Sequence, residues 1–483
     1  MNKESALLTD LYQLTMTYGY FREGRAEQPV VFDLFFRQLP PGSGYVLAAG
    51  LEQAVEYLLN LRFSQEDLAY LAQLNLFDAG FLEYLRTFRF TGDLWAVPEG
   101  TPVFPHEPLL RVTAPVVQAQ MVETALLNMV NFQSLIATKA CRVTLAAKGD
   151  PVMEFGLRRA HGPDAGVYGA RAAVIGGCVS TSNVRAGQLF GLPVSGTMAH
   201  SWVQSFPSEL EAFRAYAEAF PDNTLLLVDT YNVLRSGVPN AIKVGKELRQ
   251  KGLELKGIRI DSGDLAYLSR QARKMLDNAG FPNAIIVASN DLDEETIQDI
   301  KTQGAPIDSW GVGTALITSR NYPALGGVYK LAAVQQEGEW VPKLKISENS
   351  DKITLPGIKQ VVRFYSSENG VAMADLIALQ DEEFDPAEPL VIFHPLETWK
   401  RKTLRNFTCK KLLAPVIQAG KLVMPLPSVQ EIREYSRQEQ GRFWEEHKRL
   451  KFPQKYIVDL SEKLWRLRAG LLESAGRALN GSK

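Results

Sequence analysis

At 483 residues the chain is too long for one ordinary domain, and 46% hydrophobic with 22% charged residues is typical of a protein with a sizeable core. Fifty-three basic against 54 acidic residues give a net charge of −1, so we expect neither a nucleic-acid partner nor binding to a membrane. No apolar run approaches the roughly 20 residues of a membrane helix. The N-terminus lacks a secretory signal and the three cysteines are widely spaced, which together indicate a cytoplasmic protein.

The first 125 residues predict an α+β N-terminal domain. VVFDLFF (30–36) alternates weakly as a strand, and residues 94–115 look like short strands broken by prolines. We expect this domain to be followed by a second one over 126–345 and by a C-terminal extension over 346–483 that packs on it.

From about residue 150, short apolar runs end in small or polar residues and are each followed by a helical stretch. Residues 207–220 carry a helical apolar stripe, and two further helices end at Gly280 and Gly304. Repeated strand–helix units of this kind predict a parallel α/β sheet that closes into an irregular (β/α) TIM-like barrel. The seven strand candidates are 152–156, 172–182, 194–201, 225–232, 258–263, 285–291 and 309–316, and GGVYKLAAV (326–334) could supply an eighth.

Polar residues and glycines gather at the carboxyl ends of these strands, where α/β barrels carry their working residues. They are Glu154, Arg158, Asn183, His200, Asp229, Arg259, Asp261, Ser262, Ser289, Asn290, Gly311, Gly313 and Thr314.

Two strand ends suggest phosphate binding. VASND (287–291) and WGVGT (310–314) would each present free backbone N–H groups before a helix, and such groups bind phosphate oxygens. Without the barrel context, an ordinary tight strand-to-helix turn is the better explanation of the GxGT motif (311–314).

IRIDSGDL (258–265) places Arg259 and Asp261 on the same side of a strand. An aspartate there could accept hydrogen bonds from sugar hydroxyls, and an arginine could hold a carboxylate or a phosphate. A purely structural Arg–Asp pair remains the alternative. In EFGLRRAHG (154–162), Phe155 before Gly156 could form a platform for an aromatic substrate, whereas the bland alternative is a solvated charged loop.

These motifs in their order resemble the nicotinate phosphoribosyltransferase family. The resemblance rests on TDLYQLTM (9–16), EFGLRRAHGPDAG (154–166), GGCVSTSNVRAGQLFGLPVSGTMAHSWV (176–203), LLVDTYN (226–232), IRIDSGDL and GGVYKL (326–331). It implies transfer of ribose-5-phosphate from phosphoribosyl pyrophosphate (PRPP) to nicotinate with Mg2+, giving nicotinate mononucleotide and pyrophosphate in a salvage route to NAD.

The resemblance also implies roles for individual residues. Tyr12 of the partner subunit in a homodimer would stack on nicotinate opposite Phe155, Arg259 would face the carboxylate, and Asp261 the ribose hydroxyls. Arg158 would meet phosphate groups, and the 5′-phosphate would lie on Ser289-Asn290 and Gly311 to Thr314. Glu154, Arg259, Asp261 and His200 are expected to be catalytic, and the other substrate contacts are Asn183, Asp229, Ser262 and Lys330.

His200 matches the histidine that the family phosphorylates with ATP, which is the second co-substrate implied. An imidazole nitrogen is a nucleophile near neutral pH, although a lone histidine is more often an inert core residue. Nothing in the sequence identifies the Mg2+ ligand or the ATP-binding residues.

Three other functions compete with this interpretation: nicotinamide phosphoribosyltransferase, quinolinate phosphoribosyltransferase, and a non-catalytic nucleotide sensor built on a barrel. The nicotinamide enzyme carries an aspartate at the position of Asn183, and that charge would repel the nicotinate carboxylate. The basic runs at 343–364 and 399–411 are ambiguous, because Lys343 and Lys345 could reach pyrophosphate or ATP, whereas the 399–411 run fits a solvated face better.

Overall fold

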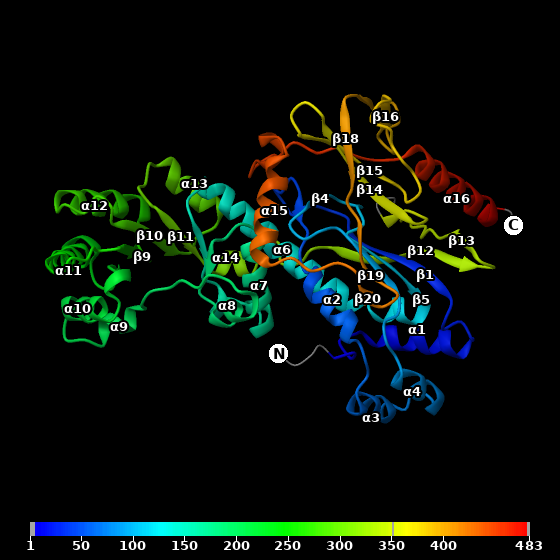
Figure 1. Cartoon of the computed structure of the whole chain (residues 1–483), viewed down its shortest axis with the longest axis horizontal. Coiled ribbons are helices and arrows are strands. Elements are labelled where there is room, and N and C mark those ends of the chain that lie inside the picture. The colour runs from blue at the N-terminus through cyan, green and yellow to red at the C-terminus, as the bar shows by residue number, and fades with distance from the viewer. Residues whose placement is uncertain (1–4, 350–351, 481–483) are drawn as a thin grey trace. The chain divides into compact units, whose positions relative to one another are not determined.

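The computed structural model describes residues 5–349 and 352–480, and the chain divides into two compact units (Figure 1). Unit 1 takes in the described residues of Met1–Leu135, Ala324–Pro427 and Glu434–Lys483, and unit 2 consists of Ile136–Pro323 with Ser428–Arg433. The first segment of the division expected from sequence and the third, apart from Ser428–Arg433, therefore fall in the same unit.

Unit 1 contains a seven-stranded sheet in the order β13-β12-β1-β5-β3-β19-β20, in which every neighbouring pair is antiparallel. The strand predicted at 30–36 is confirmed, and so are short strands within 94–115. The strands are β1 (Pro29–Phe36), β3 (Asp93–Ala96), β5 (Leu110–Pro115), β12 (Gly327–Gln336), β13 (Glu339–Pro342), β19 (Ala414–Gln418) and β20 (Lys421–Leu422).

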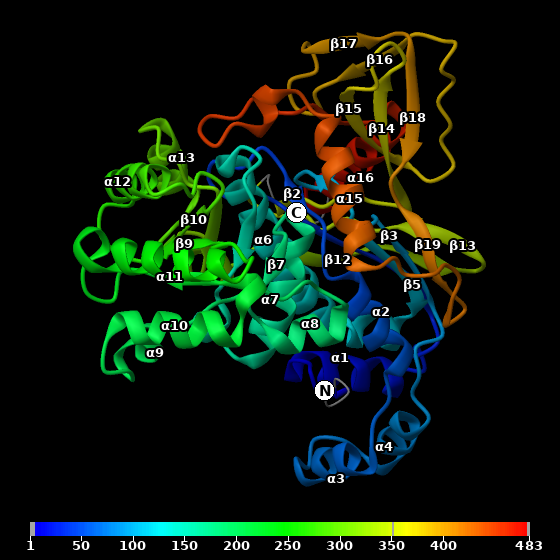
Figure 2. The same ribbon diagram turned by 60° about the vertical axis from the view of Figure 1, so that its left-hand side comes forward.

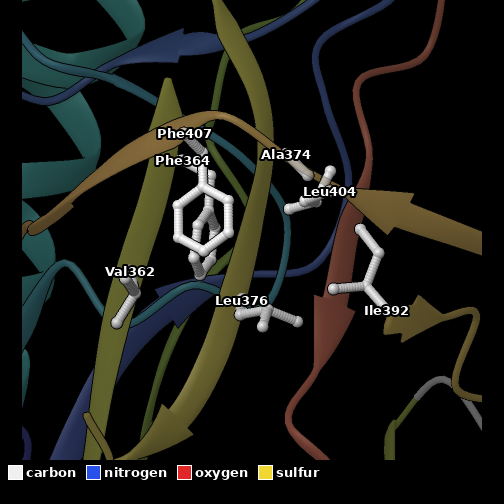
Figure 3. Packing of buried hydrophobic residues seen from close by; sticks show 7 residues of the cluster. All are labelled: Val362, Phe364, Ala374, Leu376, Ile392, Leu404 and Phe407. Atoms are coloured by element: carbon white, nitrogen blue, oxygen red, sulfur yellow. The ribbon is translucent and has the colours of Figure 1, made fainter. Parts of the chain in front are cut away.

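A second sheet of unit 1, in the order β18-β14-β15-β21, carries its own core. Alternate residues of a strand share a face, so Val362 and Phe364 point to the same side, and the ring of Phe364 meets that of Phe407 edge-on at 5.1 Å (Figure 3). The strands of this sheet are β14 (Lys359–Ser366), β15 (Ala372–Leu379), β18 (Phe407–Lys411) and β21 (Val458–Leu460). Unit 1 also contains the hairpin of β16 (Leu390–Phe393) and β17 (Arg401–Leu404) and the short antiparallel pair of β2 (Val46–Leu47) and β4 (Pro102–Val103).

The helices of unit 1 are α1 (Leu11–Arg22), α2 (Leu51–Asn60), α3 (Gln65–Gln73), α4 (Ala79–Arg86), α5 (Val116–Met121) and α16 (Glu462–Asn480). Two helices, α6 (Glu123–Ala147) and α15 (Val429–Gly441), have residues in both units. Within residues 5–349 and 352–480, no helix combines the length and apolar character that crossing a bilayer requires.

Unit 2 is built on a six-stranded parallel sheet in the order β7-β6-β11-β10-β9-β8. Its strands are β6 (Val152–Glu154), β7 (Ser180–Thr181), β8 (Leu225–Leu227), β9 (Gly257–Ile260), β10 (Ile285–Asn290) and β11 (Ser309–Val312). The last strand along the chain, β11, pairs with the first, β6, as a barrel order requires.

The helices predicted between the strands of unit 2 are confirmed. α10, α11 and α12 lie one beside the next along the sheet (Figure 2). α12 and α13 are followed by Gly280 and Gly304 at φ +85° and +70°, the left-handed conformation expected of helix stops. The helices are α7 (Pro163–Ile175), α8 (Val184–Phe190), α9 (His200–Gln204), α10 (Glu209–Ala219), α11 (Val238–Gln250), α12 (Leu265–Asn278), α13 (Glu294–Thr302) and α14 (Thr314–Ile317).

The predicted closure into a barrel is not found, and the α/β sheet of unit 2 is open. Beyond β7, pairing continues only through a single bridge between Thr181 and Val194, and no ladder within residues 136–323 joins that edge to β8. The run 172–182 forms a strand only from Ser180, because its first residues complete α7. The predicted eighth strand is β12, which pairs with β1 in unit 1 and stacks Tyr329 on Phe32 at 4.7 Å.

Candidate functional site

The carboxyl ends of the parallel strands bring together most of the site residues predicted from sequence. One hydrogen-bonded network joins His200, Asp229, Arg259, Asp261, Ser262 and Ser289. Ser289 is paired in register with Gly311 on β11, and the ring of Phe155 lies against that glycine. The network and the Phe155 loop therefore form one continuous edge of unit 2.

Asp229 is the centre of this network, and its side chain is only 1% exposed. Its Oδ1 lies 3.3 Å from Nε2 of His200, the first residue of α9. Its Oδ2 accepts hydrogen bonds from the backbone N–H of Asp261 at 3.1 Å and from the hydroxyl of Ser262 at 2.5 Å. One buried carboxylate thus connects the imidazole directly to the turn that follows β9.

Arg259 fastens the segment before His200 to the sheet. Its Nη1 donates to Thr197 Oγ1 at 2.8 Å and to the carbonyl of Met198 at 3.3 Å, and its Nε donates to Ser289 Oγ at 3.0 Å. The Ser289 hydroxyl donates in turn to Asp261 Oδ1, which lies 3.6 Å from Arg259 Nη2. Much of the guanidinium is therefore occupied by protein groups, although its side chain remains 14% exposed.

Thr197 is a member of the network that sequence reasoning missed. It stands three residues before His200 in SGTMAHSWV, and its hydroxyl accepts the shortest hydrogen bond that Arg259 makes. A hydroxyl inside a Gly-containing loop was the available signal, since backbone of this kind commonly presents side chains to a site.

Phe155 is half-buried, and its backbone N–H donates to the carbonyl of Val312 at 2.8 Å. A Cβ added to Gly311 would lie 2.6 Å from two atoms of the Phe155 ring, and one added to Gly313 would lie 3.1 Å from the Phe155 carbonyl oxygen. Close approach of the Phe155 ring thus requires glycine at position 311, and the Phe155 carbonyl leaves little room for a side chain at position 313.

The side chain of Glu154 is not accessible to a substrate, as its predicted catalytic role would require. The side chain is fully buried, and its two oxygens accept hydrogen bonds from the Thr181 hydroxyl and the backbone N–H of Gly156. Burial raises the pKa of Glu154, and the two hydrogen bonds oppose that rise. We therefore correct its role to positioning: it holds the Phe155 loop against β7.

Asn183 also has a structural task where a substrate contact was predicted. Its side chain caps α8 by accepting from the N–H of Ala186 at 3.1 Å, and its Nδ2 donates to the carbonyl of Gly166 at 3.0 Å. The residue is 1% exposed. Both ends of the amide are thus engaged by backbone, so direct contact between Asn183 and a ligand is not what the structure supports.

The remaining predicted residues of unit 2 lie at the ends of its strands or in the segments that follow them. Arg158 is exposed in the short 3-10 helix Leu157–Arg159. Asn290 is exposed at the end of β10 and has φ +133°, a strained conformation for a residue with a side chain and one that clusters at functional sites. Thr314 begins α14 directly after Gly313.

Tyr12 and Lys330 belong to unit 1 and not to the cluster in unit 2. Tyr12 is 48% exposed on α1. Lys330 lies opposite Asp33 in the register of β1 and β12, and burial lowers the pKa of its ammonium. Among the described residues, no three His, Cys, Asp or Glu side chains are gathered closely enough to hold a metal ion.

Comparisons with known proteins cover nearly the whole chain. The model of the nicotinate phosphoribosyltransferase (NAPRTase) family matches residues 151–366, its N-terminal domain matches 7–131 and its C-terminal domain matches 358–468. The nicotinate phosphoribosyltransferase of Bacillus subtilis is 50% identical over 460 residues, which is 95% of this chain and 94% of that protein.

Two solved structures share the fold. The crystal structure of human nicotinic acid phosphoribosyltransferase has a TM-score of 0.86 at 35% identity and covers 96% of this chain and 99% of its own. The nicotinate-nucleotide pyrophosphorylase of Pyrococcus furiosus has a TM-score of 0.69 at 25% identity, covering 90% and 95% of the two chains.

Proposed function

The chain belongs to the nicotinate phosphoribosyltransferase family, and we propose that it transfers ribose-5-phosphate from PRPP to the ring nitrogen of nicotinate, coupled to ATP. The products are nicotinate mononucleotide and pyrophosphate. The observation that carries the proposal is the contact of Asp229 with both His200 and the Asp261–Ser262 turn, because it links a phosphorylatable imidazole to the strand end that would hold the sugar.

The Phe155 loop supports nicotinate binding. A half-buried ring whose position is defined by Gly311 offers a flat apolar surface, and Arg158 supplies a nearby exposed cation in the same loop. Nη2 of Arg259 lies 3.6 Å from Oδ1 of Asp261. Arg259 therefore orients the Asp261 carboxylate as well as adding positive charge to the site.

The chemical step is a displacement at C1′ of the ribose. The C1′–O bond to pyrophosphate breaks as the nicotinate nitrogen attacks, and positive charge develops on the sugar. Asp261, held by Ser289 and the Asp229 network, supplies a fixed negative charge next to that centre. Rate enhancement then comes from positioning and electrostatic stabilisation, without a covalent bond between protein and sugar.

The tautomer of His200 follows from its partner. Asp229 accepts a hydrogen bond from Nε2–H, so the lone pair of the neutral imidazole lies on Nδ1. We propose Nδ1 as the nucleophile toward the γ-phosphorus of ATP: an N–P bond forms and ADP leaves. The phosphoryl group would add negative charge to His200. Only Asp229 stands between His200 and the Asp261 turn in the hydrogen-bond network, so formation and hydrolysis of the N–P bond change the electrostatic field at the sugar site.

The donor set also fits Mg2+, which binds proteins through one or two carboxylates and completes its shell with substrate phosphates and water. Asp261 is 23% exposed, and its Oδ2 takes no part in the network described above, so we propose it as the protein ligand. When bound, Mg2+ would neutralise charge on the departing pyrophosphate.

A homodimer is supported by the surface of α1. Leu8, Leu11, Tyr12 and Met16 are exposed by 36 to 53%, so this end of the chain presents an apolar stripe. We propose that the stripe packs against a second copy and that Tyr12 reaches the nicotinate site of the partner.

The test is a direct assay of the purified chain with labelled nicotinate, PRPP, Mg2+ and ATP. We expect nicotinate mononucleotide and pyrophosphate in equal amounts, little product from nicotinamide, and none from quinolinate. Preferential turnover of nicotinamide or quinolinate would replace the proposal with one of those activities. Nucleotide binding without any transfer would identify a sensor.

A further inference from the structure

Unit 1 contains a cavity of about 1100 Å³ that no step of the proposed reaction uses. It lies between residues 394–402, which form the β16–β17 loop and the start of β17, and residues 453–459, which lead into β21. Residues 39–44 and 104–106 supply the remaining wall. All of these segments belong to unit 1, and the volume is that of a pocket for a nucleotide-sized ligand.

The lining is strongly basic. The lining contains four cations, Lys400, Arg401, Lys402 and Lys455, and one carboxylate, the buried Asp459. Glu397, which is outside the lining, pairs with Lys400. Arg401 donates one N–H to the carbonyl of Thr398 at 3.2 Å, and Lys402 donates one to the carbonyl of Met373 at 3.2 Å. Each cation therefore keeps further donors for an anion, and backbone contacts hold both in place.

Two further features indicate a ligand. Trp399 lines the cavity with 73% of its surface exposed, which is unusual for the largest aromatic side chain and provides a stacking surface. Ser43 also lines the cavity and is 7% exposed, and its hydroxyl has no hydrogen-bond partner among the described residues. A buried hydroxyl without a partner is costly, so this unpartnered polar atom at the cavity wall is a further unusual feature of the place.

His106 adds backbone strain at the same place. It lines the cavity and has φ +70°, in the left-handed region that residues with side chains rarely adopt. Strained backbone of this kind is retained where the surrounding structure needs the conformation, commonly at binding sites.

We propose that this cavity binds a purine or pyridine nucleotide carrying at least two phosphates, with the base on Trp399 and the phosphates on Arg401, Lys402 and Lys455. The site would be regulatory, because it is built entirely from unit 1 residues that have no part in the transfer chemistry. It also assigns a role to the basic run at 399–411, of which only the first four residues line the cavity.

The experiment is calorimetric titration of the full chain with ADP, pyrophosphate and adenosine, comparing wild type with Trp399→Ala and Lys402→Gln. Matched controls are Trp444→Ala, which removes another exposed tryptophan, and Arg405→Gln, which removes a cation of the same run; neither lines the cavity. Trp399 and Lys402 are exposed, so both variants are expected to fold.

In wild type we expect two ADP sites per chain, one of them at the catalytic centre. Trp399→Ala should weaken one ADP site about tenfold and leave pyrophosphate binding unchanged, since only the base stacks on the ring. Lys402→Gln should weaken the binding of both ADP and pyrophosphate at that site and reduce the salt dependence of their affinity. A single ADP site that neither variant affects would overturn the proposal, as would equal losses in the control variants.

Discussion

The ring of Phe155 lies against the Cα of Gly311, so close that an added Cβ would lie 2.6 Å from ring atoms Cδ2 and Cε2. Gly311 therefore determines where the Phe155 ring lies. Gly311 is also paired in register with Ser289 on the neighbouring strand β10. This contact joins the proposed nicotinate and sugar parts of the site through two neighbouring strands.

Gly311→Ala should consequently displace the Phe155 ring and weaken nicotinate binding. Overpacking costs about 1–3 kcal/mol, so we expect the KM for nicotinate to rise about tenfold or more with a smaller change for PRPP. Steady-state kinetics with each substrate varied separately measures this. Gly326→Ala is the matched control, because no atom lies within 4 Å of a Cβ added there. An unchanged KM for nicotinate in Gly311→Ala would remove Phe155 from the site.

Asn183→Asp should first reduce stability. The buried Nδ2 donates to the Gly166 carbonyl, and an aspartate would place an oxygen opposite an oxygen there while still capping α8. We expect a loss of about 1–3 kcal/mol in the free energy of unfolding. Asn232→Asp serves as the control, because Asn232 is an exposed cap whose Oδ1 accepts from Arg235 N–H.

The same Asn183→Asp variant tests substrate choice. If the ligand lies close to residue 183, the added negative charge should weaken the binding of nicotinate more than that of nicotinamide, because only nicotinate carries a carboxylate. Equal losses for the two substrates would mean that Asn183 acts on stability alone.

Glu154 predicts a pH dependence of stability. Its pKa is raised by burial above its ordinary value of 4.5, so the native state holds its proton to higher pH than the unfolded chain does. The contribution of protonated Glu154 to the free energy of unfolding is complete below pH 4.5, and it is lost as the pH rises through the raised pKa of the native state. Glu154→Gln removes the ionisable group and keeps an amide oxygen, which can accept one of the two hydrogen bonds that Glu154 accepts, from the Gly156 N–H or from the Thr181 hydroxyl.

Urea unfolding of wild type and Glu154→Gln over a pH series checks this. We expect the stability of wild type to decline relative to the glutamine variant as pH rises from 4.5. A difference that does not vary with pH would show that Glu154 titrates alike in both states.

Tyr12 tests the shared site. The residue is 48% exposed, so Tyr12→Ala should leave the free energy of unfolding within about 0.5 kcal/mol of wild type while lowering activity. Chains carrying Tyr12→Ala, when mixed with chains carrying Asp261→Asn, should recover activity, because a mixed dimer restores one complete site. Sedimentation measures whether the chains form the proposed dimer. No recovery from stable mixed dimers would place Tyr12 outside the partner's site.

Sequence patterns located most strand ends because a parallel strand and its following loop are local features. The strand predicted at 194–201 was wrong, since that run forms only an isolated bridge at Val194 before α9 begins at His200. The edge with Asp229, Arg259, Asp261 and Ser289 was found in this way. Closure of the sheet was not predictable: β12 has the alternation of any strand, and only its long-range partner β1 decides which sheet receives it.

The roles of Glu154 and Asn183 were not predictable for a related reason. Both stand at strand ends, where polar residues were taken as site residues, but burial turns their side chains to Thr181, Gly156 and Gly166. A sequence shows that a polar residue occupies such a position, whereas only the folded chain shows which way the residue faces.

The most direct test of the coupling through Asp229 measures ATP consumption and mononucleotide formation together in wild type and His200→Ala. We expect wild type to hydrolyse ATP in step with product and to carry acid-labile phosphate on the chain. His200→Ala should form mononucleotide at a residual rate with no ATP consumed, because the displacement at C1′ does not need the imidazole. ATP hydrolysis that stays in step with product in His200→Ala would contradict the proposed role of the His200–Asp229 pair.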